Sequence, residues 1–95
     1  MKNENYFQVQ YWMINELKLK GNELMLFAII HGFTKSRKGK YHGSQRFISE
    51  ALKISRLTAG RTINKLLDKD FIIRTSESHY VSNINESYYV DNIDA

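Results

Sequence analysis

The side chains best suited to chemistry in this sequence are basic and hydroxyl residues between positions 55 and 74. They are Ser55, Arg56, Thr58, Arg61, Thr62, Lys65, Lys69 and Arg74, with the apolar Leu57 among them. Arginine forms paired hydrogen bonds with a guanine edge, hydroxyl groups bind bases or phosphates, and an apolar side chain contacts the thymine methyl. Lysine suits phosphates, which position a protein on DNA without reporting its sequence. The set therefore predicts contacts to double-stranded DNA, with Arg56 and Arg61 as the expected base readers.

Positive charge is concentrated in the same part of the chain. Residues 35–74 carry eleven Lys and Arg against three Asp and Glu, a net of +8, whereas residues 1–34 are balanced and residues 75–95 carry −4. A basic segment between neutral and acidic ends is typical of a polyanion-binding surface. Lys38 and Lys40 belong to this segment and are expected to contact phosphates from a loop. The alternative interpretation is a solvated, lysine-rich surface.

The sequence lacks the patterns that mark an enzyme, a metal site or a cofactor site. It has no glycine-rich phosphate loop and no nucleophile elbow, and its three histidines lack metal-ligand spacing. We therefore expect no catalysis, no metal and no cofactor. The lack of cysteine and of a secretory signal predicts a cytoplasmic protein. The longest apolar run, residues 24–30, is far shorter than the ~20 residues of a membrane-spanning helix, so no membrane partner is expected.

Apolar spacing, glycines and capping residues predict the elements that position these side chains. In chain order they are a short helix over about 11–17, a central helix over 22–34, a short strand over 40–42, a helix over 45–52, a recognition helix over about 56–69 and two strands over 71–75 and 79–82. The predicted fold class is α+β, mostly α: a winged helix-turn-helix with a short three-stranded sheet and a hairpin wing. Arg74 is the expected contact from the wing.

Residues 48–72 match the helix-turn-helix pattern in detail. Ala51 is the small residue expected where the two helices cross, and the apolar Ile54 closes the turn. Ser55 is placed to cap the free amides of the second helix. Lys53 stands where glycine is common, so either a left-handed backbone or a slightly different turn is expected there. The residues expected to face inward are Phe47, Ile48, Ala51 and Leu52 from the first helix, and Ala59, Ile63, Leu66 and Leu67 from the second.

Several stretches together resemble a known family. They are Phe7 to Leu24, with Tyr11-Trp12-Met13 and Lys20-Gly21-Asn22-Glu23-Leu24, then Ala28 to Phe33, Tyr41 to Ser44, and the helix-turn-helix. The chain resembles the N-terminal domains of replication initiators, or replisome organisers, of phages and prophages of Gram-positive bacteria. The resemblance implies an origin-binding domain with a role in DNA replication, followed in the full protein by a region, not in this chain, that recruits the helicase loader. We expect residues 1–84 to form the DNA-binding domain and residues 85–95 a polar, acidic tail or linker.

Other functions fit the same sequence. A transcriptional regulator would read an operator with the same helix. A winged helix used as a protein-docking module is the alternative from another class, with Tyr6, Phe7, Tyr88 and Tyr89 as the partner surface. The sequence leaves a homodimer open, because helix-turn-helix proteins often bind paired half-sites but this chain has no heptad seam.

Overall fold

The computed structural model describes residues 8–35, 45–76 and 79–89. Its elements are helices α1 (Tyr11–Asn15), α2 (Gly21–Lys35), α3 (Gln45–Leu52) and α4 (Arg56–Asp68) and strands β1 (Ile72–Ser76) and β2 (His79–Ser82). Residues 86–89 form a further helical turn. The described part is thus mostly helical with one antiparallel hairpin, as the α+β class predicted. The sheet described has two strands, not the three predicted, and the expected strand at 40–42 lies outside the described residues.

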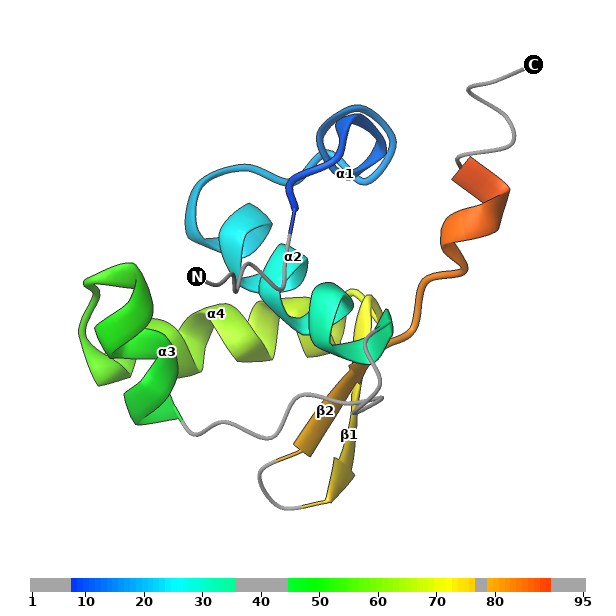
Figure 1. Cartoon of the computed structure of the whole chain (residues 1–95). Coiled ribbons are helices and arrows are strands. Elements are labelled where there is room, and N and C mark those ends of the chain that lie inside the picture. Colours follow the sequence, from blue (N-terminus) through cyan, green and yellow to red (C-terminus); the bar gives the residue numbers. More distant parts are fainter. Residues whose placement is uncertain (1–7, 36–44, 77–78, 90–95) are drawn as a thin grey trace, which may run out of the picture.

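Helix α2 lies at the centre of the core because its apolar residues point in several directions. Every side chain from Leu26 to His31 is buried. The helix contacts α1, α3, α4 and β2, and Figure 1 shows these elements arranged around it. Trp12 of α1 packs edge-on against Phe27, with 6.1 Å between the ring centroids. The predicted central helix is confirmed, although it begins at Gly21, one residue earlier than expected.

The turn between α3 and α4 has the conformation that its residues predict. Lys53 lies in the left-handed region, with a φ of 59°. The Ile54 N–H donates to the Ser49 carbonyl at 2.9 Å, and the Ile54 side chain packs against the core. The Ser55 hydroxyl accepts a hydrogen bond from the Thr58 N–H at 3.0 Å, which is the expected helix cap. The start of α4 is therefore fixed by local contacts.

The buried face of α3 differs from the prediction. Ile48 and Ser49 are buried, whereas Ala51 is exposed and Phe47 is 47% exposed. The expectation that Ala51 is the small residue facing α4 is wrong, and Ser49 is the small buried residue of this helix. The Ser49 hydroxyl donates to the Arg46 carbonyl at 2.9 Å, so it is buried with its hydrogen bond satisfied. The prediction differed because it relied on apolar residues alone, whereas the buried Ser49 is polar.

The hairpin packs its buried residues against two helices. Ile72 pairs with Ser82 and Arg74 pairs with Tyr80 in the antiparallel register, and a bulge lies between Arg74 and Ser76. Ile72 and Tyr80 are both buried. Strand β2 contacts α2 and strand β1 contacts α4. The hairpin is thus held against the same core that positions α4.

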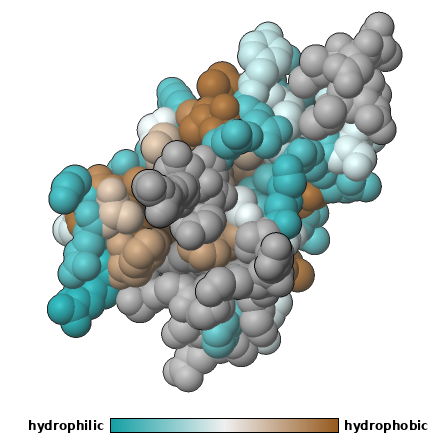
Figure 2. Space-filling model, viewed as in Figure 1, coloured by the Kyte–Doolittle hydropathy of each residue, from teal (hydrophilic) through white to brown (hydrophobic). Residues whose placement is uncertain are grey.

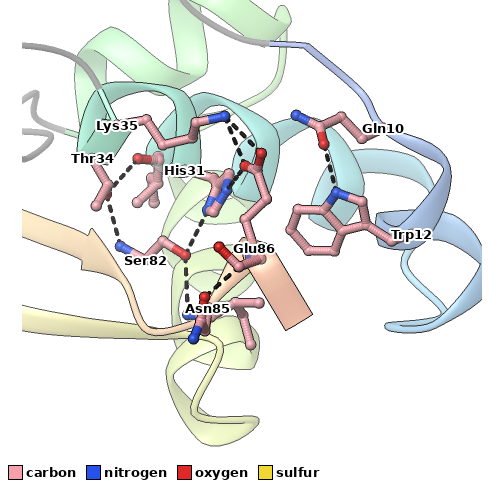
Figure 3. A network of polar contacts seen from close by, with 11 residues as sticks. Gln10, Trp12, His31, Thr34, Lys35, Ser82, Asn85 and Glu86 are labelled. Carbon is pink, nitrogen blue, oxygen red and sulfur yellow. Dashed lines mark hydrogen bonds and ion pairs between the residues drawn. The ribbon is translucent and has the colours of Figure 1, made fainter. Parts of the chain in front are cut away.

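Polar contacts attach residues 86–89 to the end of α2 (Figure 3). His31, which is buried in α2, places Nδ1 2.8 Å from the Ser82 hydroxyl and Nε2 2.7 Å from Glu86 Oε1. Lys35 Nζ lies 2.8 Å from the same carboxylate. Tyr89 stacks on the Trp12 ring, with 5.2 Å between centroids and 8° between planes. The first residues of the expected tail therefore contact the body of the fold.

Glu86 makes the stability of the fold sensitive to acid. Burial raises the pKa of its carboxyl, but hydrogen bonds and charges from Lys35 and His31 lower it by more, so the net pKa lies below the ordinary 4.5. A carboxyl with a lowered folded pKa stabilises the fold above its unfolded pKa, and this contribution is lost as pH falls through the folded pKa. We expect the urea-derived free energy of unfolding to fall below pH 4.5 less steeply for Glu86→Gln than for the wild type.

The matched control is Glu50→Gln. Glu50 forms an exposed i,i+4 pair with Arg46, an arrangement that contributes little to stability. This variant is expected to follow the wild-type pH profile. Equal acid sensitivity of Glu86→Gln and the wild type would show that the contact with His31 and Lys35 does not stabilise the fold.

Candidate nucleic-acid interface

Helix α4 buries one face and exposes the opposite one. Ala59, Ile63 and Leu66 are buried, as predicted. The exposed side chains of α4 are Arg56, Leu57, Arg61, Asn64, Lys65 and Asp68. With 3.6 residues per turn, positions 57, 61, 64 and 68 form one stripe along the outside of the helix, which we call the outer stripe. The structure thus brings Leu57 and Arg61 together on the surface, with Arg56 and Lys65 to either side.

The threonines of α4 do not face outward as expected. Thr62 is only 5% exposed, and its hydroxyl donates to the Thr58 carbonyl at 2.8 Å. The prediction that Thr62 faces outward is therefore wrong. A threonine can be buried in this way because the preceding turn satisfies its hydroxyl. Thr58 is half-buried, and its hydroxyl lies 3.0 Å from that of Ser55, so both side chains serve the helix cap.

Asn64 is a surface residue that the sequence analysis missed. It lies on the outer stripe between Arg61 and Asp68 and is exposed. Its amide carries both donor and acceptor groups, which is the pattern that pairs with an adenine edge. Its spacing of three residues from Arg61 and seven from Leu57 would have identified it, because those positions share one helix face.

A groove runs beside α4, between that helix and the segment that leads into α2. Its volume is about 740 Å³, and both the 18–23 segment and α4 line it. Its charged lining residues are Lys18, Lys20, Glu23, Arg61, Lys65 and Lys69. Lys69, expected to contact phosphate, pairs instead with Glu23 in this structure, with 2.8 Å between Nζ and Oε1. Lys18 and Lys20 were missed because the net charge of residues 1–34 is zero.

Arg74 lies exposed on the hairpin, as predicted for a wing contact. Its guanidinium lies 5.5 Å from the centroid of the Tyr80 ring, and one of its nitrogens lies 3.4 Å from the Tyr80 hydroxyl. A cation over an aromatic face is attracted to it, so Tyr80 orients the charge. Lys38 and Lys40, the other expected phosphate contacts, lie outside the described residues.

The surface also carries exposed apolar side chains, which bear on the docking alternative. On the face seen in Figure 2, hydrophobic residues form small patches among hydrophilic ones. Tyr88 is 64% exposed and Tyr11 65%, whereas Tyr89 is covered by Trp12. Tyr6 and Phe7 lie outside the described residues. The described aromatic residues thus split between core and surface.

Comparisons of the chain with protein-family models, curated proteins and solved structures find no match. Among the described residues, no three His, Cys, Asp or Glu side chains are grouped so as to hold a metal ion. No helix in the described ranges is long and apolar enough to cross a membrane.

Proposed function

We propose that this protein binds double-stranded DNA in a sequence-dependent manner through α4. The observation that carries the proposal is the exposed outer stripe of a capped, thirteen-residue helix, bordered by a groove rich in lysine and arginine. An α-helix fits the major groove, which is ~12 Å wide. The order of α3, turn, α4 and hairpin supports a winged helix-turn-helix, in which the second helix reads the bases.

The exposed residues of α4 have distinct proposed roles. Arg61 and Arg56 bind guanine edges, Asn64 binds an adenine edge, and Leu57 contacts a thymine methyl. Lys65 contacts phosphate, because lysine offers a point charge rather than a planar pair of donors. Arg74 contacts the DNA backbone from the hairpin, which its exposure permits.

The resemblance to replication initiators favours a phage or plasmid replication origin as the DNA site, with the helicase loader as a further partner of the full protein. An operator bound by a transcriptional regulator would be read by the same side chains. Mapping the preferred sequence onto the source genome decides between the two. Sedimentation of the complex shows whether one chain or a homodimer occupies the site.

The test is fluorescence anisotropy of a labelled duplex library and of matched single strands, over a series of salt concentrations. We expect the logarithm of the binding constant to fall linearly with the logarithm of salt concentration, since bound lysines and arginines release counterions. The preferred duplex should bind at least ~10³-fold more tightly than unrelated duplexes. Binding that is absent at low salt, or equal for all duplexes, would contradict the proposal.

Asn64→Ala is expected to relax the base preference at one position of the site. A bidentate asparagine–adenine contact discriminates against other bases by about 1–3 kcal/mol, and Asn64 is exposed, so its loss should leave stability within about 0.5 kcal/mol of wild type. Affinity for duplexes substituted at each position in turn measures the effect. Asn15→Ala makes the same change at an exposed position of α1 and should keep the wild-type preference. Unchanged preference in Asn64→Ala would remove this residue from the reading surface.

A further inference from the structure

Lys18 and Lys20 are held on the surface by the residues that alternate with them. Leu17 and Leu19 are buried, with 8% and 1% exposure, whereas both lysines are exposed. The N–H groups of Leu17 and Leu19 each donate to a carbonyl of α1 at 3.1 Å. Burial of the two leucines fixes the backbone of this segment against the core and leaves both lysine side chains at the surface. Both lysines line the groove beside α4.

The groove holds more positive charge than its own residues neutralise. Five cationic side chains and one carboxylate line it, which leaves an excess of four positive charges. The carboxylate, Glu23, is paired with Lys69. Among the described residues, none of the other four cations (Lys18, Lys20, Arg61, Lys65) has an ion-pair partner. Like charges gathered in one groove attract anions.

The position of the groove identifies the kind of anion. Arg61 and Lys65 belong both to the exposed face of α4 and to the groove lining. When a helix enters the major groove, side chains beside that helix meet the phosphates of the strand that borders it. A row of phosphates matches a row of lysines, and contacts of this kind carry no sequence information.

We propose that this groove holds the phosphate backbone of one DNA strand, and that Lys18 and Lys20 are phosphate contacts of the bound duplex. The inference rests on the proposed function and extends the DNA-binding surface beyond α4 and the hairpin. Glu23 opposes the bound strand in this arrangement, because it contributes the negative charge of the groove and holds Lys69.

Lys18→Asn and Lys20→Gln test the proposal in the whole chain. Lys18 has a φ of 59°, which asparagine tolerates well, so this variant removes the charge without adding strain. Each variant should lower the magnitude of the salt slope by about 0.9 and weaken all duplexes by the same factor. Lys20→Arg keeps the charge and is the matched control, with a slope equal to wild type. Glu23→Gln should bind more tightly and show a steeper slope.

The outcomes separate this inference from the proposed function. If duplexes bind with a preference that depends on Arg61 and Asn64, while Lys18→Asn and Lys20→Gln keep the wild-type slope, the groove proposal is overturned and the proposed function stands. Weaker binding by Glu23→Gln would also overturn it. If the wild type binds no duplex, both proposals fail. If the two lysines contribute only to binding of single strands, the groove proposal alone fails.

Discussion

Arg61→Ala is expected to weaken binding to the preferred duplex by about 1–3 kcal/mol, a factor of roughly 5 to 150. Arg61 lies on the outer stripe of α4 and also lines the charged groove. In the proposed complex, its removal eliminates a paired hydrogen bond to a base together with a charge near the DNA backbone. The measurement is anisotropy of the preferred duplex and of one unrelated duplex at several salt concentrations.

Two further measurements distinguish loss of the paired hydrogen-bond donors from loss of charge and from loss of stability. Arg61→Lys keeps the charge but lacks the planar pair of donors, so it should retain the salt slope and lose much of the sequence preference. Urea unfolding of Arg61→Ala should stay within about 0.5 kcal/mol of wild type, because the side chain is exposed. Wild-type affinity and preference in Arg61→Ala would mean that α4 does not read DNA.

Trp12→Ala is expected to lower the free energy of unfolding by about 3–5 kcal/mol. Trp12 is 1% exposed and contacts three rings, those of Phe27, His31 and Tyr89, so its loss opens a cavity between α1, α2 and the turn at 86–89. That cost is a large fraction of the 5–15 kcal/mol typical of small domains. Urea unfolding followed by circular dichroism measures it, because the variant has no tryptophan fluorescence.

Tyr11→Ala is the matched control for the core variant. Tyr11 is the preceding residue on the same helix, but it is 65% exposed, so truncation should change stability by no more than about 0.5 kcal/mol. A loss below about 1 kcal/mol in Trp12→Ala would contradict the placement of this ring at the centre of the core.

The part of the fold that could be predicted from sequence is the part set by local rules. Helix α4 was predicted because Ser55 supplies a cap and Ala59, Ile63 and Leu66 recur at helical spacing. The left-handed turn at Lys53 was one of two alternatives that the sequence left open, and the structure selects it. The central position of α2 was predicted because its apolar residues surround the helix axis.

The errors and omissions arise from contacts that local patterns do not encode. Ser49 and Thr62 are buried because each hydroxyl bonds to a carbonyl within its own helix, which makes a polar residue compatible with the core. Lys18 and Lys20 reach α4 across about forty residues of sequence, so only the tertiary fold brings them to the groove. The contact between His31 and Glu86 spans 55 positions and is equally invisible to helical spacing.

In the described part of the chain, the turns after α1, α3 and α4 each place a residue other than glycine in the left-handed region. Lys18, Lys53 and Asp70 follow α1, α3 and α4 with φ values of 59°, 59° and 63°. A residue with a β-carbon pays about 1–2 kcal/mol in this conformation, and lysine lacks the short polar side chain that lets asparagine or aspartate offset the cost. Replacement of either lysine by asparagine is therefore expected to raise the thermal stability and to remove one positive charge. At Lys18 and Lys53, a more stable turn therefore comes with less positive charge to attract polyanions. Substitutions in the core leave this charge unchanged.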